Sequence, residues 1–282
     1  MELTLLGTGT PIPDPRRAGP SQIVRVGDDR ILIDCGTGAV RRLVEAGDSP
    51  RDVHTVLITH MHSDHSIDLG HFLITRWILF NERPLSLIGP PGLQEYVDNL
   101  LRLLDWDIKI RGFATRLSDE ARRIDVREVA PGERVEGDHW RATPIKVDHY
   151  PVEHAYAWRL DAEGASLVIS GDTAPYEPLA EAAAGVDVLV HEAWLKPKHE
   201  AARQHMPPAE AEAFIAKRNR YPRLPQPPAQ KHSALARRPV APAPCPSSPP
   251  SPGAPVVPPR PAWSPNRPSA PLPLGGRAAA PA

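Results

Sequence analysis

Residues 55–65, TVLITHMHSDH, join a short apolar run directly to a turn that carries three histidines and an aspartate. The β-branched run predicts a strand that ends at His60, and the C-terminal ends of strands are where open α/β sheets bind ligands. His60 and His62 can project toward one point, and Asp64 and His65 toward a second point nearby. This spacing predicts a two-metal site for zinc, with manganese or iron as alternatives. A solvated His-rich loop is the competing interpretation.

Two metal shells need more ligands than this turn supplies, and other predicted strand ends carry candidates. His149 and His154 follow one strand, and both are open as the third histidine, with His149 favoured because it ends the apolar run. Asp172 follows another strand and can bridge two metals with its two oxygens, although an Asx turn or a helix cap would explain it alone. His191 ends a further strand, either as a wall of the site or as a packed histidine. His205 precedes a helix opened by two prolines.

The first three quarters of the chain have the pattern of an α/β domain, which we place at residues 1–216. Short β-branched or alternating runs, bounded by Gly, Pro and Asp, alternate with helical patterns, which favours sheets covered by helices. We expect strands at 2–6, 22–26, 30–34, 55–60, 85–89, 124–129, 141–147, 155–160, 166–170 and 187–191, and helices within 38–47, 68–79, 92–104 and 176–185.

Composition changes abruptly after this domain. Residues 222–282 hold 20 of the 36 prolines and seven Lys or Arg, and no acidic residue follows Glu212. We therefore expect 217–282 to be a Pro-rich, disordered tail. Two distant cysteines, no apolar run long enough to span a bilayer and no signal-peptide pattern favour a cytoplasmic protein without membrane contact.

Six segments together resemble the metallo-β-lactamase superfamily, most closely its ribonuclease Z-like and arylsulfatase-like branch. The segments are LLGTGTPIPDPRRAGPS, ILIDCGTGAV, LITHMHSDH, GPPG, VISGDTAP and VLVHEAW, and they occur in the order seen in that family. The resemblance implies an αββα sandwich with two metal ions, expected to be zinc, between the upper edges of two sheets.

The resemblance also implies roles for single residues. His60, His62 and His149 would hold the first metal, Asp64 and His65 the second, and Asp172 would bridge them. Asp64 would also orient the attacking water, and His205 would help to protonate the leaving group. The implied activity is hydrolysis by a metal-bound hydroxide.

The sequence indicates the substrate less clearly than it indicates the fold and the metal site. Ribonuclease Z enzymes carry a long RNA-gripping arm between the third histidine and the bridging aspartate, whereas only 23 residues separate His149 from Asp172 here. We therefore expect a small phosphodiester, sulfate or carboxylic ester, with RNA as the less favoured partner. The alternatives are a ribonuclease Z-like RNA 3′-end endonuclease and a metal-binding protein with little or no activity. A homodimer is compatible with the sequence.

The C-terminal part of the sandwich is expected to be incomplete. The family pattern continues after the helix that follows His205 into an apolar strand ending in Thr-His, whose histidine closes the second metal's shell. In this chain, residues 219–244 are NRYPRLPQPPAQKHSALARRPVAPAP instead. We hypothesise a frameshift near codons 213–221, with a genuine Pro-rich tail as the alternative. Either origin predicts a weakened second metal site and impaired activity.

Overall fold

The computed structural model describes residues 1–193, which form two sheets and their covering helices. The tail, His205 and the hypothesised frameshift position lie outside the described residues. The strands are β1 (Glu2–Gly7), β2 (Ser21–Val26), β3 (Asp29–Ile33), β4 (Thr55–Leu57), β5 (Leu85–Gly89), β6 (Ile124–Glu128), β7 (Val135–Glu136), β8 (Trp140–Lys146), β9 (Tyr156–Ala162), β10 (Ala165–Ile169) and β11 (Val188–Val190). The helices are α1 (Ala39–Glu45), α2 (Ser63–Ser66), α3 (Leu69–Ile78), α4 (Leu93–Arg111), α5 (Phe113–Arg116), α6 (Asp119–Arg122) and α7 (Glu177–Ala182), with a 3-10 turn at Pro50–Asp52.

The strands are divided between two mixed sheets. The first has the order β1-β2-β3-β4-β5-β6, and the second β11-β10-β9-β8-β7. In the first sheet β1, β2 and β3 pair antiparallel, while β3, β4, β5 and β6 pair parallel. In the second sheet only β10 and β11 pair parallel. The parallel strands bring the loops that follow β3, β4 and β5 to one edge of the first sheet.

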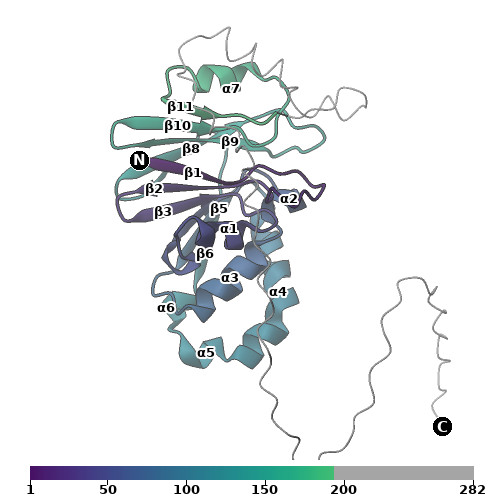
Figure 1. Cartoon of the computed structure of the whole chain (residues 1–282), viewed down its shortest axis with the longest axis vertical. Coiled ribbons are helices and arrows are strands. Elements are labelled where there is room, and N and C mark those ends of the chain that lie inside the picture. Colours follow the sequence, from purple (N-terminus) through teal and green to yellow (C-terminus); the bar gives the residue numbers. More distant parts are fainter. Residues whose placement is uncertain (194–282) are drawn as a thin grey trace, which may run out of the picture. The chain divides into compact units, whose positions relative to one another are not determined.

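The two sheets pack face to face between two layers of helices (Figure 1). Side chains alternate along β3, so this strand contributes apolar residues to both faces of the first sheet. Leu32 packs under the helices, while Ile31 and Ile33 pack toward the second sheet. Trp158 is fully buried between the sheets, and Leu179 of α7 packs on the outer face of the second sheet. The expected αββα sandwich of the metallo-β-lactamase type is confirmed for the described part.

The predicted elements agree with the structure where periodicity was strong. Ten of the eleven strands and α1, α3, α4 and α7 overlap the expected segments, although α4 continues seven residues past the expected 104, whereas the two-residue β7 and the one-turn helices α2, α5 and α6 were not expected. On α1, Val40 and Leu43 are buried, but Val44 is 57% exposed, so the apolar face is narrower than the sequence suggested. None of the helices within residues 1–193 has the length and apolar character needed to traverse a bilayer.

A buried arginine joins α3 to the loops before β4 and β5. Arg76 is 1% exposed, and its guanidinium donates to the Val53 carbonyl at 3.0 Å, the Arg83 carbonyl at 2.9 Å and His54 Nδ1 at 2.8 Å. Burial lowers the pKa of Arg76 to about 10, and no carboxylate among the described residues forms an ion pair with it. Since His54 Nδ1 accepts this hydrogen bond, the neutral ring carries its proton on Nε2.

We expect this arrangement to make the fold sensitive to mild acid. Burial, with the charges of Arg76 and Arg83, lowers the pKa of His54 from 6.5 to about 4. The unfolded chain therefore takes up a proton near pH 6.5 that the folded chain resists, so stability is full above that pH and falls as the pH drops toward 4. Urea unfolding at pH 7 and pH 5 measures the effect.

His54→Gln provides the control, because its amide oxygen can accept from Arg76 at both pH values. The variant is expected to lose less stability than the wild type between pH 7 and pH 5. An equal loss in both chains would show that His54 does not contribute.

Candidate metal centre

The His-rich turn lies where the edges of the two sheets meet. β4 ends at Leu57, and the chain passes through Thr59 and His60 to the one-turn helix α2, which carries Asp64 and His65. The Thr59 carbonyl accepts from the backbone N–H of Tyr156 at 2.9 Å, which links the end of β4 to the start of β9 in the second sheet. The turn is therefore held by both sheets.

The first group comprises three histidines whose ring nitrogens converge. His60 Nε2 lies 3.1 Å from His62 Nδ1, and His149 Nε2 lies 3.2 Å from the same atom. Tetrahedral zinc with Zn–N bonds of about 2.0–2.1 Å places its ligand nitrogens about 3.3 Å apart. A single ring nitrogen cannot satisfy two others with one proton, whereas one cation satisfies all three. The spacing of this group therefore fits a metal ion.

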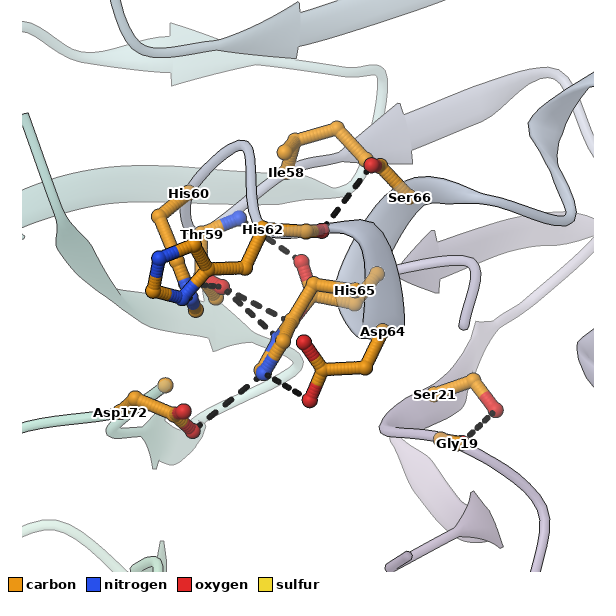
Figure 2. Close-up of polar contacts among 12 residues, drawn as sticks. Gly19, Ser21, Ile58, Thr59, His60, His62, Asp64, His65, Ser66 and Asp172 are labelled. Atoms are coloured by element: carbon orange, nitrogen blue, oxygen red, sulfur yellow. Dashed lines mark hydrogen bonds and ion pairs between the residues drawn. The ribbon is translucent and has the colours of Figure 1, made fainter. Parts of the chain in front are cut away.

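The second group joins α2 to the loop after β10. His65 Nε2 lies 3.3 Å from Asp172 Oδ1 and 3.7 Å from Asp64 Oδ2, and the two carboxylates approach it from different sheets (Figure 2). His60 lies beside this group too, with its ring centroid 4.1 Å from that of His65. The liganding atoms of His60, His65 and Asp172 all lie within 4.8 Å of one another. The two groups thus share one imidazole and form a continuous centre.

Asp34 fixes the orientation of His65. Its Oδ2 accepts from His65 Nδ1 at 2.7 Å and from the Thr59 hydroxyl at 2.8 Å, while its Oδ1 accepts from the Thr59 N–H. With Nδ1 protonated toward Asp34, the neutral ring presents the Nε2 lone pair to the oxygens of Asp64 and Asp172. Those three electron-rich atoms repel one another unless a proton or a metal cation lies between them, and an imidazole with two carboxylates is a donor set that zinc binds, so the second group also fits a metal ion.

The histidine pKa values follow from burial and neighbouring charge. Burial acts to lower the pKa of His65, but the Asp34 and Asp172 carboxylates outweigh it and raise the pKa well above its ordinary value. Burial and the adjacent His65 lower the pKa of His60 well below its ordinary value. His60 is therefore held neutral, which is the form that binds metals.

Glycines allow the neighbouring loops to approach α2 closely. A Cβ on Gly36 would lie 2.0 Å from the Asp64 carbonyl oxygen, and one on Gly19 would lie 2.9 Å from the same atom. Cys35, between Asp34 and Gly36, donates its backbone N–H to the His65 carbonyl at 2.7 Å. Larger side chains at the glycines would push α2 away from its position.

A cavity of about 290 Å³ opens onto the second group. Asp64, His65 and Asp172 line it together with the loop after β1 and the residues after β11, including His191 and Glu192. Glu192 Oε1 accepts from the Thr173 N–H at 2.7 Å, which holds the loop that carries Asp172. This concave, polar site is suited to a small charged group at the metal centre.

The structure brings together six of the predicted site residues: His60, His62, Asp64, His65, His149 and Asp172. His149 is 1% exposed and belongs to the first group, whereas His154 is exposed on the following turn. His191 lines the cavity wall, and burial lowers its pKa. Asp64 lies in α2 and is 7% exposed, so this part of the expected turn is a buried one-turn helix. Asp34 was not predicted, although an aspartate directly after the apolar strand 30–33 was a usable signal.

Asp34→Asn is expected to weaken metal binding about 10- to 100-fold, the usual cost of losing a carboxylate that orients a liganding histidine. The amide has one oxygen in place of two, so it cannot accept from the Thr59 N–H and also from the Thr59 hydroxyl and His65, and it lacks the charge that holds the His65 ring. Competition with a chelator of known zinc affinity measures the change. Asp125→Asn, an exposed aspartate paired with Arg123, is the control. Wild-type affinity in Asp34→Asn would contradict this role.

Comparisons by sequence agree with the geometry. The profile of a family described as "Beta-lactamase superfamily domain" matches residues 29–223. A ribonuclease Z of Mycobacterium avium (strain 104) is 44% identical over 194 residues, which cover 68% of this chain and 69% of the relative. A ribonuclease Z of Mycobacterium sp. (strain KMS) is 41% identical over 206 residues, which cover 72% of each chain.

Comparisons by structure support the same fold. The human tRNase Z short form has a TM-score of 0.62 at 20% identity, covering 76% of this chain and 87% of that one. A metallo-beta-lactamase fold protein from Bacillus subtilis has a TM-score of 0.59 at 19% identity, covering 76% and 81%. A diphosphatase of the PhnP family has a TM-score of 0.58 at 19% identity, covering 77% and 82%. At these identities the likeness concerns the fold alone.

Proposed function

Because the chain belongs to the metallo-β-lactamase superfamily of hydrolases, we propose that it is a metal-dependent endonuclease of the ribonuclease Z type, acting at the 3′ end of precursor tRNA. The similarity to ribonuclease Z at 41–44% identity over two thirds of the chain carries this proposal. The two convergent groups of metal-capable side chains support it, since a two-metal centre suits phosphodiester hydrolysis.

In this proposal His60, His62 and His149 hold one metal ion, Asp64 and His65 hold the other, and Asp172 bridges them. Zinc is the expected metal because imidazole and carboxylate ligands at these spacings suit it, with manganese or iron as alternatives. When bound, such ions lower the pKa of a coordinated water and stabilise negative charge on a phosphoryl oxygen.

Other roles in the proposed reaction are to orient the attacking water, to position the metal ligands and to protonate the leaving group. The Asp64 carboxylate lines the cavity and orients the attacking water by accepting a hydrogen bond from it. Asp34 and Thr59 hold the His65 ring, and Glu192 holds the loop that carries Asp172. We assign protonation of the leaving group to His205, which lies outside the described residues.

The preference for a small ester over RNA, drawn from the short interval between His149 and Asp172, is not supported by the relatives. That interval is the β9–β10 hairpin, so the structure agrees that no arm lies there. Sequence similarity nevertheless points to ribonucleases. The homodimer, the cytosolic location and the domain boundary at 216/217 stay predictions.

We expect the two metal sites to differ in affinity. The first group has three imidazoles, of which those of His60 and His149 are buried and that of His62 is exposed, whereas the second has one dedicated imidazole and two carboxylates. In the family the second site gains a histidine from a strand beyond residue 216, where this chain is Pro-rich. Calorimetric titration of the metal-free chain with zinc should therefore show one tight and one weak site, with low turnover. Two equally tight sites would show that another residue supplies the ligand.

A parallel assay on two substrates tests the function. The zinc-loaded chain is incubated with a precursor tRNA that carries a 3′ trailer and, separately, with bis(p-nitrophenyl) phosphate. Endonucleolytic release of the trailer is the expected result. Turnover of the small ester with an intact precursor would favour the small-ester hydrolase instead, and inactivity on both substrates with metal bound would favour a metal-binding protein.

A further inference from the structure

A glutamine amide oxygen in the wall of the cavity has no partner within residues 1–193. Gln22, at the start of β2, is 7% exposed and lines the cavity that Asp64, His65 and Asp172 also line. Its Oε1 is buried, and no hydrogen-bond donor among the described residues reaches it. An unsatisfied buried amide costs stability, so such a group in a native fold calls for an explanation. Neighbouring β2 residues Ile23 and Val24 are apolar and fully buried, so a polar residue is not needed for packing.

The same cavity contains an arginine whose charge is not neutralised. Arg17, on the loop between β1 and β2, lines the cavity, and its side chain forms no ion pair within residues 1–193. Its neighbour Arg16 is instead paired with Asp14 at 3.0 Å. The loop is held in place, since Gly9 N–H donates to the Ala18 carbonyl at 2.7 Å. The lining of the cavity therefore includes a cation and an unpaired amide beside the carboxylates of the metal centre.

We propose that Gln22 binds the ribose 2′-hydroxyl of the nucleotide whose 3′ oxygen carries the scissile phosphate, while Arg17 binds an adjacent phosphate oxygen. This inference rests on the proposed ribonuclease function. A primary amide offers both an acceptor and donors, and a 2′-hydroxyl is both donor and acceptor. In RNA that hydroxyl is on the carbon next to the one bearing the phosphate, so a group that faces the reacting phosphate from the cavity wall can reach it.

The assignment makes Gln22 a residue that selects RNA and costs stability in the free protein. Gln22→Met keeps the side-chain volume and removes the polar atoms. The variant should therefore lose both the stability cost of the unpaired amide and the contact with the ribose 2′-hydroxyl. We expect its thermal midpoint to rise by about 3 °C, because a buried unsatisfied group is lost. We expect KM for precursor tRNA to rise about tenfold with kcat little changed, because the contact binds ground state and transition state alike.

The experiment pairs this variant with an altered substrate. Wild type and Gln22→Met are each given the precursor and the same precursor with one 2′-deoxynucleotide on the 5′ side of the cleavage site. The wild type should show a KM about tenfold higher for the deoxy substrate, and the variant should not distinguish the two. Gln94→Leu, on the exposed face of α4, is the control and should behave like the wild type.

Each outcome is decisive. Equal KM values of the wild type for the two precursors would overturn the inference without any variant. A Gln22→Met chain that still discriminates between the substrates would do the same, while both results leave ribonuclease activity intact. A wild type that cleaves no RNA would remove the proposed function and this inference together.

Discussion

The double variant His62→Ala with His65→Ala should purify with almost no bound metal. His62 Nδ1 is the atom on which the His60 and His149 nitrogens converge, and His65 Nε2 is the only imidazole nitrogen that faces both Asp64 and Asp172 in the described part of the chain. Removing both residues leaves each group with too few ligands for zinc. Metal per chain, measured by mass spectrometry on the purified protein, gives the result.

A matched pair of histidines controls for unspecific binding. His139 and His154 are exposed and belong to neither group, so His139→Ala with His154→Ala should retain the metal content of the wild type. Undiminished zinc in the His62→Ala, His65→Ala chain would show that the metal binds elsewhere.

Asp64→Asn should lower turnover of precursor tRNA by about 100-fold or more, in the range found when a group that handles the reacting proton is lost. Asn has the same shape, so the buried position in α2 keeps its packing, while the charge facing the second group is lost and one of the two acceptor oxygens becomes an NH2 donor. The midpoint of urea unfolding should change little.

The control for this variant is Asp98→Asn, which changes an aspartate on the exposed side of α4 where it accepts from Gln94. That variant should keep the wild-type rate. Near-normal turnover by Asp64→Asn would make Asp64 only a structural neighbour of the centre.

The fold could be predicted from the sequence because its strands are short and apolar on at least one face. β2, β3, β5 and β10 carry continuous or alternating buried residues, and Gly or Pro bounds most of them. The helices α5 and α6 have four residues each, too few for a helical period to appear, and they are held by the chain on either side. Val44 shows that an apolar residue at a helical spacing need not be buried.

The candidate metal ligands that cluster in the sequence were predictable. Residues that act by positioning those ligands were less predictable. The turn 60–65 was recognisable by spacing alone, His149 and Asp172 were candidates from their places at predicted strand ends, and the family resemblance gave them roles. Asp34 acts through a contact with His65, and Gln22 lines a cavity built from segments far apart in sequence, which only the folded chain reveals. The choice between His149 and His154 likewise depended on which one the turn after β8 buries.

Cleavage of precursor tRNA as zinc is titrated into the metal-free chain tests the central claim most directly, namely that metal held by these two groups drives RNA hydrolysis. The account predicts no cleavage without metal and a rate that rises only after the tight site has filled, as the weaker site takes up zinc. Cleavage at the full rate by the metal-free chain, in the presence of excess chelator, would contradict it.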